Sequence, residues 1–230
     1  PPPKAKNRGG GGEARGKDKK KITKVLFVRR NISFPHFHNL SRTKAAALLA
    51  TMLDGEFVIR PSSQGMNMLT VTRRVHGDLL HDIQIVMHGQ PNKMQVGTRL
   101  EVEIGGVKHA YEDLDELVIA CIEPLNDLDR KLQEHEKFTH KEAEAIRAKL
   151  QEMKAAGGGR TTPYLFGFNR QQPGSYILFW LPGRNVREES VRPVLEGWRF
   201  RQIVHPSLNR LINWFKAHAT DPPPGAGAPP

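Results

Sequence analysis

The sequence predicts an α+β fold in which two related domains are packed in tandem and joined by a helical linker. A helix, a run of short strands and a closing helix occur in this order twice along the chain. The two closing helices share one apolar spacing without a gap, at Leu114, Leu117, Val118 and Cys121 and again at Leu208, Leu211, Ile212 and Phe215. With 230 residues, 38% of them hydrophobic, the chain can build two small cores.

The net charge of +11 is concentrated at the start of the chain. Residues 1–30 contain 11 Lys and Arg against 2 Asp and Glu, whereas the remaining residues contain 24 against 22. We therefore expect residues 1–28 to form a disordered basic arm that could contact nucleic acid through residues 1–30. Residues 221–230, rich in Pro and Gly, are expected to form a disordered tail.

The first predicted domain covers residues 29–124. Ser41 is expected to cap a helix that ends at Asp54-Gly55. Asp113 and Glu116 form a capping box for the closing helix, which is expected to end near residue 123. The strands between these helices are expected at residues 57–60, 68–74, 79–87 and 100–104.

The second predicted domain, residues 139–220, follows a helical linker at residues 125–138. A polar helix is expected over residues 126–156, with a second capping box formed by Thr139 and Glu142. Four strands are expected at residues 164–169, 175–181, 185–194 and 198–204, before a last helix capped by Ser207.

Arg60 ends a short buried strand and is the strongest candidate for a functional side chain. Because strand side chains alternate, Phe57 and Ile59 face one side of the sheet and Arg60 faces the other. A guanidinium at the edge of a core needs an acceptor, and the donors of Ser62-Ser63 suit a phosphate. The residues alone leave two interpretations open, an anion pocket and a structural arginine bound to a nearby carboxylate or carbonyl.

Other kinds of site find little support in the sequence. His135 and His140 are five residues apart on an expected helix, so they do not share a face. The single cysteine, Cys121, lies on an apolar helix face and rules out an intramolecular disulfide. We therefore expect no catalytic residues, no metal site, no cofactor and no membrane contact.

Several motifs resemble a known family. The first helix, the strand Gly-x-Phe-Val-Ile-Arg-x-Ser, the strand meander and the closing Leu-x-x-Leu-Val helix resemble a Src homology 2 (SH2) domain. The wider pattern resembles the tandem SH2 module of the Spt-six family of transcription elongation factors and histone chaperones. This wider resemblance rests on Phe37-His38-Asn39, Leu69-Thr70-Val71-Thr72, Tyr111 to Glu116, Pro173-Gly174, Gly197 to Arg201 and Trp214-Phe215-Lys216.

The resemblance implies that the first half holds a phosphate pocket. Arg60 matches the central arginine of that pocket, and Ser62 and Ser63 match its turn. Two positions depart from the family, because Met68 and Asp82 stand where histidines are usual. His81, by a one-residue shift, and Arg73 are the candidates to compensate.

The resemblance also implies that the second half lacks the arginine. If the strand at residues 164–168 is equivalent to the strand that carries Arg60, Phe168 takes the place of Arg60. If the strand at residues 175–179 is the equivalent, Phe179 takes that place. We favour the first alignment. An unusual basic surface then helps to bind the same ligand, with Arg199, Arg201, Arg210 and Lys216 as candidates.

The implied function is phosphopeptide binding in the nucleus by a monomeric module without enzymatic activity. The implied partner is the phosphorylated linker that precedes the C-terminal repeats of the largest subunit of RNA polymerase II. The alternative is a mainly structural scaffold with a weak phosphate pocket, whose basic arm binds nucleic acid.

Overall fold

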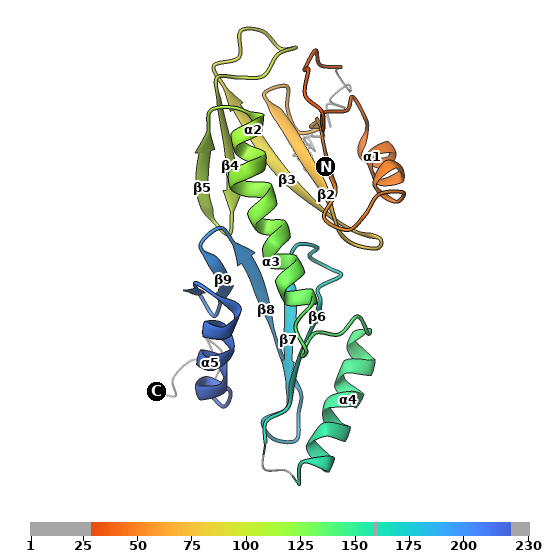
Figure 1. The fold of residues 1–230 in the computed structure, drawn as a ribbon, viewed down its shortest axis with the longest axis vertical. Helices are drawn as coiled ribbons and strands as arrows, with labels where there is room; N and C mark the ends of the chain where they lie inside the picture. The colour runs from red at the N-terminus through yellow and green to blue at the C-terminus, as the bar shows by residue number, and fades with distance from the viewer. Residues whose placement is uncertain (1–28, 159–160, 222–230) are drawn as a thin grey trace, which may run out of the picture.

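The computed structural model describes residues 29–158 and 161–221. The basic arm and nearly all of the tail predicted from the sequence lie outside the described residues. Two five-stranded antiparallel sheets lie one beyond the other, and a long helix runs along both of them (Figure 1). The expected α+β architecture of two similar domains is therefore confirmed.

The first sheet is a meander in which every strand pairs with its neighbour in the chain. Its strands are β1 (Phe57–Pro61), β2 (Met68–His76), β3 (Leu79–His88), β4 (Arg99–Ile104) and β5 (Val107–Tyr111). Helix α1 (Arg42–Leu49) covers one face, packing Ala45 and Leu49 against Val58. Its N-cap is Ser41, as expected, because the Ser41 hydroxyl accepts a hydrogen bond from the backbone N–H of Lys44.

The other face is covered by the long helix, which we call the linking helix and which comprises α2 (Leu114–Leu117), η1 (Val118–Ile122) and α3 (Glu123–Gln133). Asp113 caps it, as expected, by accepting from the N–H of Glu116. The expectation that this helix ends near residue 123 is wrong. Pro124 has no N–H to donate, and the preceding π-helical turn of η1 lets the chain continue into α3.

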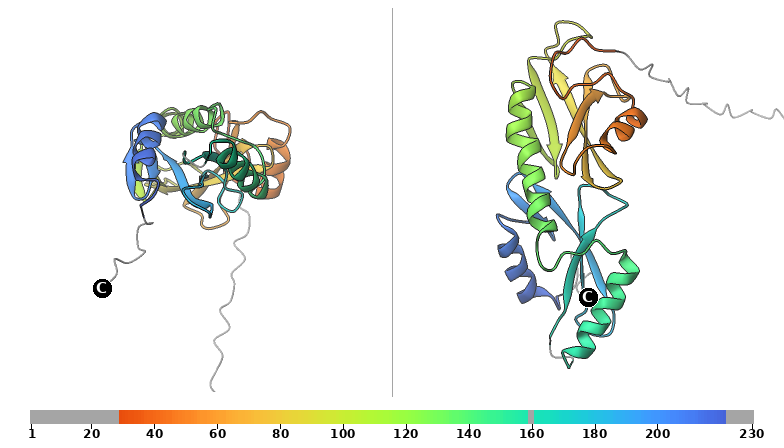
Figure 2. Two further views of the ribbon diagram at one scale, coloured as in Figure 1. Left: turned by 90° about the horizontal axis from the view of Figure 1, so that it is seen from below. Right: turned by 45° about the vertical axis from the view of Figure 1, so that its right-hand side comes forward.

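The second sheet repeats the meander with β6 (Tyr164–Phe168), β7 (Tyr176–Trp180), β8 (Arg187–Val194), β9 (Gly197–Phe200) and β10 (Ile203–His205). Helices α4 (Ala143–Ala156) and α5 (Leu208–His218) flank it on opposite sides (Figures 1 and 2). Ser207 caps α5, as expected. The linking helix contributes Leu125 to the first core and Leu132 to the second, so both domains pack on one element.

The predicted helix over residues 126–156 is broken, and Thr139 does not cap it. The backbone on either side of Phe138 pairs with Phe166 of β6: the N–H of Thr139 donates to Phe166 O at 2.9 Å, and the N–H of Phe166 donates to Lys137 O at 2.8 Å. This extended pairing prevents a helix from starting at Thr139, and α4 begins after Glu142 instead.

Two hairpins were not expected from the sequence. Strand β5 follows Gly105 and Gly106, whose φ angles of 59° and 83° form a tight turn that glycine favours. The predicted strand at residues 198–204 is two strands, because Arg201 and Gln202 adopt φ angles of 49° and 65°. Tertiary pairing therefore bends both segments of chain more sharply than their strand propensity indicates.

A buried polar network joins the two domains along the linking helix. Arg73 of β2 forms an ion pair with Asp129 of α3, and their side chains are 0% and 6% exposed. The hydroxyl of Tyr176 in β7 donates to Asp129 Oδ1 at 2.7 Å. Arg73 also donates to Asn126 Oδ1 at 2.9 Å. A carboxylate on the linking helix thus bonds to both sheets at once.

Candidate functional site

Arg60 lies on the face of the first sheet that α1 covers, as the alternation of β1 predicts. The strand register places it opposite Thr70, with Thr72 and Asp82 following on the same face of β2 and β3. The residue is 4% exposed, so its guanidinium lies inside the fold rather than on its surface. A charged group at this depth requires partners.

The side chain of Arg60 bonds to one group each on β1, β2 and β3. Its Nε donates to Thr72 Oγ1 at 2.9 Å, and its Nη1 donates to Pro61 O at 3.4 Å. Its Nη2 lies 3.3 Å from Asp82 Oδ1. Among the residues that the structure describes, the guanidinium therefore has one charged partner, the Asp82 carboxylate, at a distance that is long for a charge-assisted hydrogen bond.

Asp82 is held more firmly by its other neighbours. The Thr72 hydroxyl donates to Oδ1 at 2.6 Å, and Arg42 Nε, from the first turn of α1, donates to Oδ2 at 2.7 Å. Burial by itself raises the pKa of the Asp82 carboxyl, but the bonds from Thr72 and Arg42 and the charge of Arg60 outweigh it and lower the pKa. The carboxylate is thus an anion that two arginines share.

The serine turn after β1 is partly engaged. Ser62 is 9% exposed, and its hydroxyl donates to Gln84 Oε1 at 3.0 Å and accepts from the N–H of Gln64 at 3.1 Å. Ser63 is exposed, and Met68, where the family usually has histidine, is half-buried. The Thr70 hydroxyl also donates to Gln84 Oε1, at 3.1 Å.

The structure does not bring His81 and Arg73 together with Arg60. The register of β2 and β3 is not shifted here, so Thr72 and Asp82 face α1 while Arg73 and His81 face the linking helix. Arg73 belongs to the interdomain network, and its Nε donates to His81 Nδ1 at 3.2 Å. The expectation that either residue completes the Arg60 pocket is therefore corrected by the sheet geometry.

His81 is a neutral ring at the domain boundary. Burial, followed by the charge of Arg73, lowers the pKa of His81 to about 3, and these outweigh the charge of Asp82, which raises the pKa. Because Nδ1 accepts from Arg73, the ring proton is on Nε2. His81 also contacts Gly174 of the second domain, where a side chain would collide with the ring.

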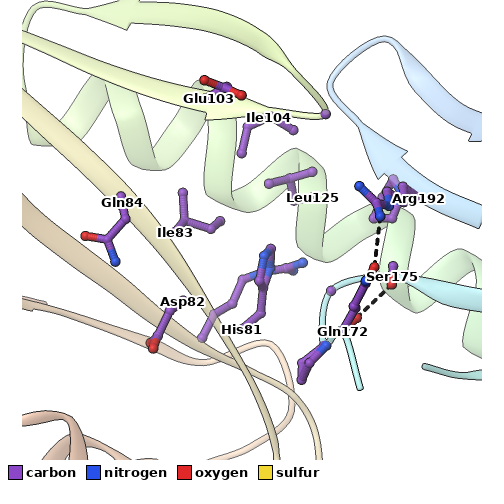
Figure 3. A pocket seen from close by; sticks show the side chains of 15 residues that line it. His81, Asp82, Ile83, Gln84, Glu103, Ile104, Leu125, Gln172, Ser175 and Arg192 are labelled. Atoms are coloured by element: carbon purple, nitrogen blue, oxygen red, sulfur yellow. Dashed lines mark hydrogen bonds between the residues drawn. The ribbon is translucent and has the colours of Figure 1, made fainter. Parts of the chain in front are cut away.

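A cavity of about 440 Å³ lies beside His81, between the domains (Figure 3). Ile83 and Leu125 line it from the first domain and the linking helix, and Gln172 and Arg192 line it from the second domain. Arg192 Nη2 donates to Gln172 Oε1 at 2.8 Å. Arg60 and Ser62 do not line this cavity, but Asp82 and Gln84, which bond to them, do.

The second domain has no arginine at the position equivalent to Arg60. The bridges Phe37–Ile59 and Phe138–Phe166 occupy the same place in the two domains, so Gly167 aligns with Arg60. Both expected alternatives, Phe168 and Phe179, are therefore wrong, although β6 is the equivalent strand. An aromatic ring still lies nearby, because a Cβ at Gly167 would meet Phe179 and the tip of Ile146. An apolar cluster of α4 and β7 fills the space of the guanidinium.

The four candidates for a second basic surface do not form one patch. Arg199 donates to Gly105 O in the first domain. Arg201 is paired with Glu189 at 2.6 Å, with a side chain only 4% exposed beneath Trp214. Only Arg210 and Lys216, both on α5, are exposed. Arg199 and Arg201 therefore stabilise the fold, and the two α5 residues remain available at the surface.

Sequence reasoning missed Arg42 and Thr72. Thr72 could have been found, because alternation along β2 places it on the face of Arg60. Arg42 could not, because its contact with Asp82 depends on how α1 docks onto the sheet. Within residues 29–158 and 161–221, no cluster of His, Cys, Asp or Glu could hold a metal ion, and none of the helices described there is long and apolar enough to cross a membrane.

Comparisons with known proteins identify related sequences and folds. The family model described as "SH2 domain" matches residues 5–218. The chain is 32% identical over 207 residues to the transcription elongation factor SPT6 of Drosophila melanogaster and 26% identical over 213 residues to the SPT6 homolog of Arabidopsis thaliana. These alignments cover 87% and 90% of this chain but only 11% and 13% of those relatives.

Two solved structures share the fold. One is the tandem SH2 domain of the elongation factor Spt6, described as binding the phosphorylated C-terminal repeat domain of RNA polymerase II; its TM-score is 0.77 at 23% identity, covering 84% of this chain and 97% of that one. The other is the tandem SH2 domains of Spt6 from Antonospora locustae, with a TM-score of 0.64 at 18% identity, covering 79% of this chain and 92% of that one. The resemblance to the tandem SH2 module of the Spt-six (Spt6) family is confirmed.

Proposed function

This chain belongs to the SH2 domain family, and we propose that it is a phosphopeptide-binding module of a nuclear transcription elongation factor. Its partner is the phosphorylated linker before the C-terminal repeats of the largest RNA polymerase II subunit. The module binds and does not catalyse. In keeping with this, burial raises the pKa of the Cys121 thiol, which is not the state of a reactive cysteine.

One observation carries the proposal: Arg60 is buried at the end of β1 in the first domain, and the equivalent position in the second domain is Gly167. The same fold therefore forms with and without this arginine. Burying a guanidinium is costly even beside one carboxylate, so a role other than stability would account for keeping Arg60 at this position. Binding an anionic ligand is the role that explains its presence in one domain only.

The chemistry of the site fits a phosphate. A phosphoryl group carries a charge of about −1.5 to −2 and three acceptor oxygens. Arg60 and Arg42 reach the site from β1 and α1 and already converge on the oxygens of one carboxylate. An incoming phosphate can bond to the same guanidinium groups, with the hydroxyl of exposed Ser63 as a further donor.

The test is fluorescence anisotropy with three labelled peptides: the linker peptide phosphorylated, the same peptide unphosphorylated, and phosphorylated C-terminal repeats. We expect the phosphorylated linker to bind at least tenfold more tightly than either of the others. Equal affinity for the phosphorylated and unphosphorylated linker would contradict the proposal. Equal affinity for phosphorylated linker and repeats would leave phosphopeptide binding standing but refute the choice of the linker.

Arg60→Ala locates the ligand. If the guanidinium bonds to the phosphate, its removal costs about 2–5 kcal/mol of phosphopeptide binding. Arg60→Lys keeps a positive charge beside Asp82 but loses the planar fork, so it separates charge from geometry. Arg99→Ala is the control, because Arg99 is an exposed arginine at the start of β4. An Arg60→Ala protein with native melting and unchanged affinity would place the ligand elsewhere.

A further inference from the structure

We propose that Asp82 is an internal competitor of the ligand: its carboxylate occupies the place of the phosphate between Arg42 and Arg60 and weakens phosphopeptide binding. This inference rests on the proposed function of the Arg60 site. It assigns to Asp82 a role in setting affinity that is separate from holding the fold together.

The contacts of Asp82 are those that a phosphate would make. One oxygen lies 3.3 Å from Arg60 Nη2 and accepts from Thr72 at 2.6 Å, and the other oxygen accepts from Arg42 at 2.7 Å. Two guanidinium groups from different elements and one hydroxyl therefore surround a small anion. An incoming phosphate must displace this anion or bind beside it.

The net charge of the site gives the direction of the effect. Arg42 and Arg60 supply two positive charges, and the Asp82 carboxylate cancels one of them. A phosphate dianion bound here is attracted by a net charge of +1 instead of +2, and it approaches a carboxylate of its own sign. A carboxylate about 6 Å from a dianion lowers affinity roughly tenfold even at the dielectric constant of water, and by more in a partly buried site.

Comparison with the second domain shows which contact of Asp82 the fold uses in both domains and which contact occurs in the first domain alone. Glu188 of β8 stands at the position equivalent to Asp82, and it pairs with Arg147 of α4 at 2.8 Å. An ion pair between the first helix and the third strand is thus common to both domains. The contact with a strand arginine occurs only in the first domain, because Gly167 replaces Arg60 in the second. The ion pair between helix and sheet therefore does not require Arg60.

The exposure of the three charged side chains supports the idea that a phosphate can displace the Asp82 carboxylate from Arg42. The Arg42 and Asp82 side chains are 66% and 23% exposed, whereas the Arg60 side chain is only 5% exposed. Water can therefore reach the outer side of the Arg42–Asp82 pair. Surface ion pairs of this exposure contribute little to stability. A ligand can break the outer pair without disturbing the sheet.

The test is Asp82→Asn in the whole chain, measured with the phosphorylated linker peptide. Asparagine keeps an oxygen that accepts from Thr72 and Arg60 but removes the charge. We expect affinity to rise about tenfold. Asp127→Asn, an exposed change of the same charge on the linking helix, controls for net charge and is expected to change affinity less than twofold. If Asp82→Asn does not fold, Asp82→Ser, whose hydroxyl also accepts from Thr72, replaces it.

A second measurement excludes an indirect structural effect. When the carboxylate is gone, Arg42 is free to bond to the phosphate, so Arg42→Gln should reduce affinity several-fold more in the Asp82→Asn background than in the wild-type chain. A role of Asp82 limited to stability would leave the effect of Arg42→Gln the same in both backgrounds. That result, or an Asp82→Asn affinity equal to or below wild type, overturns the inference.

The two proposals fail in different ways. If Arg60→Ala abolishes binding and Asp82→Asn brings no gain, the phosphate site stands and the competitor role is refuted. If Arg60→Ala leaves binding unchanged, the proposed site is wrong and the role of Asp82 is refuted with it.

Discussion

Removal of the Asp129 carboxylate is expected to destabilise the tandem arrangement more than any exposed substitution. Asp129 accepts from Arg73 of the first sheet and from Tyr176 of the second, and it is 4% exposed. In Asp129→Ala the Arg73 guanidinium stays buried at 0% side-chain exposure and loses its only carboxylate within the described contacts. Its remaining partners there are the neutral groups of Asn126 and His81.

The magnitude follows from the cost of an uncompensated buried charge. Breaking a buried ion pair by removing one partner typically costs about 3–5 kcal/mol. For a chain of this size, each kcal/mol lowers the melting temperature by about 2–4 °C, so a decrease of roughly 10 °C is expected. The loss of the hydrogen bond from Tyr176 adds to the effect in the same direction.

The assay is urea unfolding followed by circular dichroism, with thermal melting as a second measure. Asp127→Ala is the matched control, because Asp127 lies two residues away on α3 and pairs with exposed Arg130; its effect is expected to be below about 0.5 kcal/mol. If Asp129→Ala lowers the free energy of unfolding by less than about 1 kcal/mol, the buried network does not hold the two domains together.

Two further predictions concern the same boundary. Gly174→Ala should destabilise the chain by about 1–3 kcal/mol, because Gly174 has a φ of 86° and its new Cβ would press on the His81 ring; Gly183→Ala, where a Cβ meets open space, is the control, and equal melting of the two would contradict it. His81 has a pKa of about 3 when folded and about 6.5 when unfolded, so the unfolded state binds the proton first as pH falls. Burial of neutral His81 therefore does not reduce the free energy of unfolding above about pH 6.5. Below that pH, the free energy of unfolding falls by about 1.4 kcal/mol per pH unit. Urea titrations from pH 7 to pH 4 should show the stability difference between wild type and His81→Gln shrinking, and a constant difference would refute this assignment.

Local sequence signals account for much of the fold. Ser41, Asp113 and Ser207 were predicted as helix caps, and each side chain accepts from the backbone N–H three residues later. These signals act within a few residues, so the sequence contains them in full. Thr139 carries a similar signal, but pairing with Phe166 overrides it. The start of α4 was therefore set by a contact between segments that are distant in the sequence.

The candidate site likewise combines features that local sequence predicts with features that depend on tertiary contacts. Alternation along β1 predicted the face of Arg60 correctly, and the unshifted register confirms that Asp82 rather than His81 lies on that face. The Arg42 contact requires the docking of α1, and the alignment of Gly167 with Arg60 requires the bridge between Phe138 and Phe166. Sequence pattern identifies which side of a strand a residue faces, whereas the partners on that side come from tertiary packing.

The two domains act as a matched pair for judging what the fold needs. In the second domain, Ile146 and Phe179 fill the space beside Gly167 with apolar contacts. Such packing is generally as stabilising as a buried ion pair, or more so, because no charge has to be desolvated. The first domain instead keeps Arg60 buried, with a threonine and a distant carboxylate as partners. An apolar side chain at that position would serve the fold at least as well, so the guanidinium is better explained by what it binds.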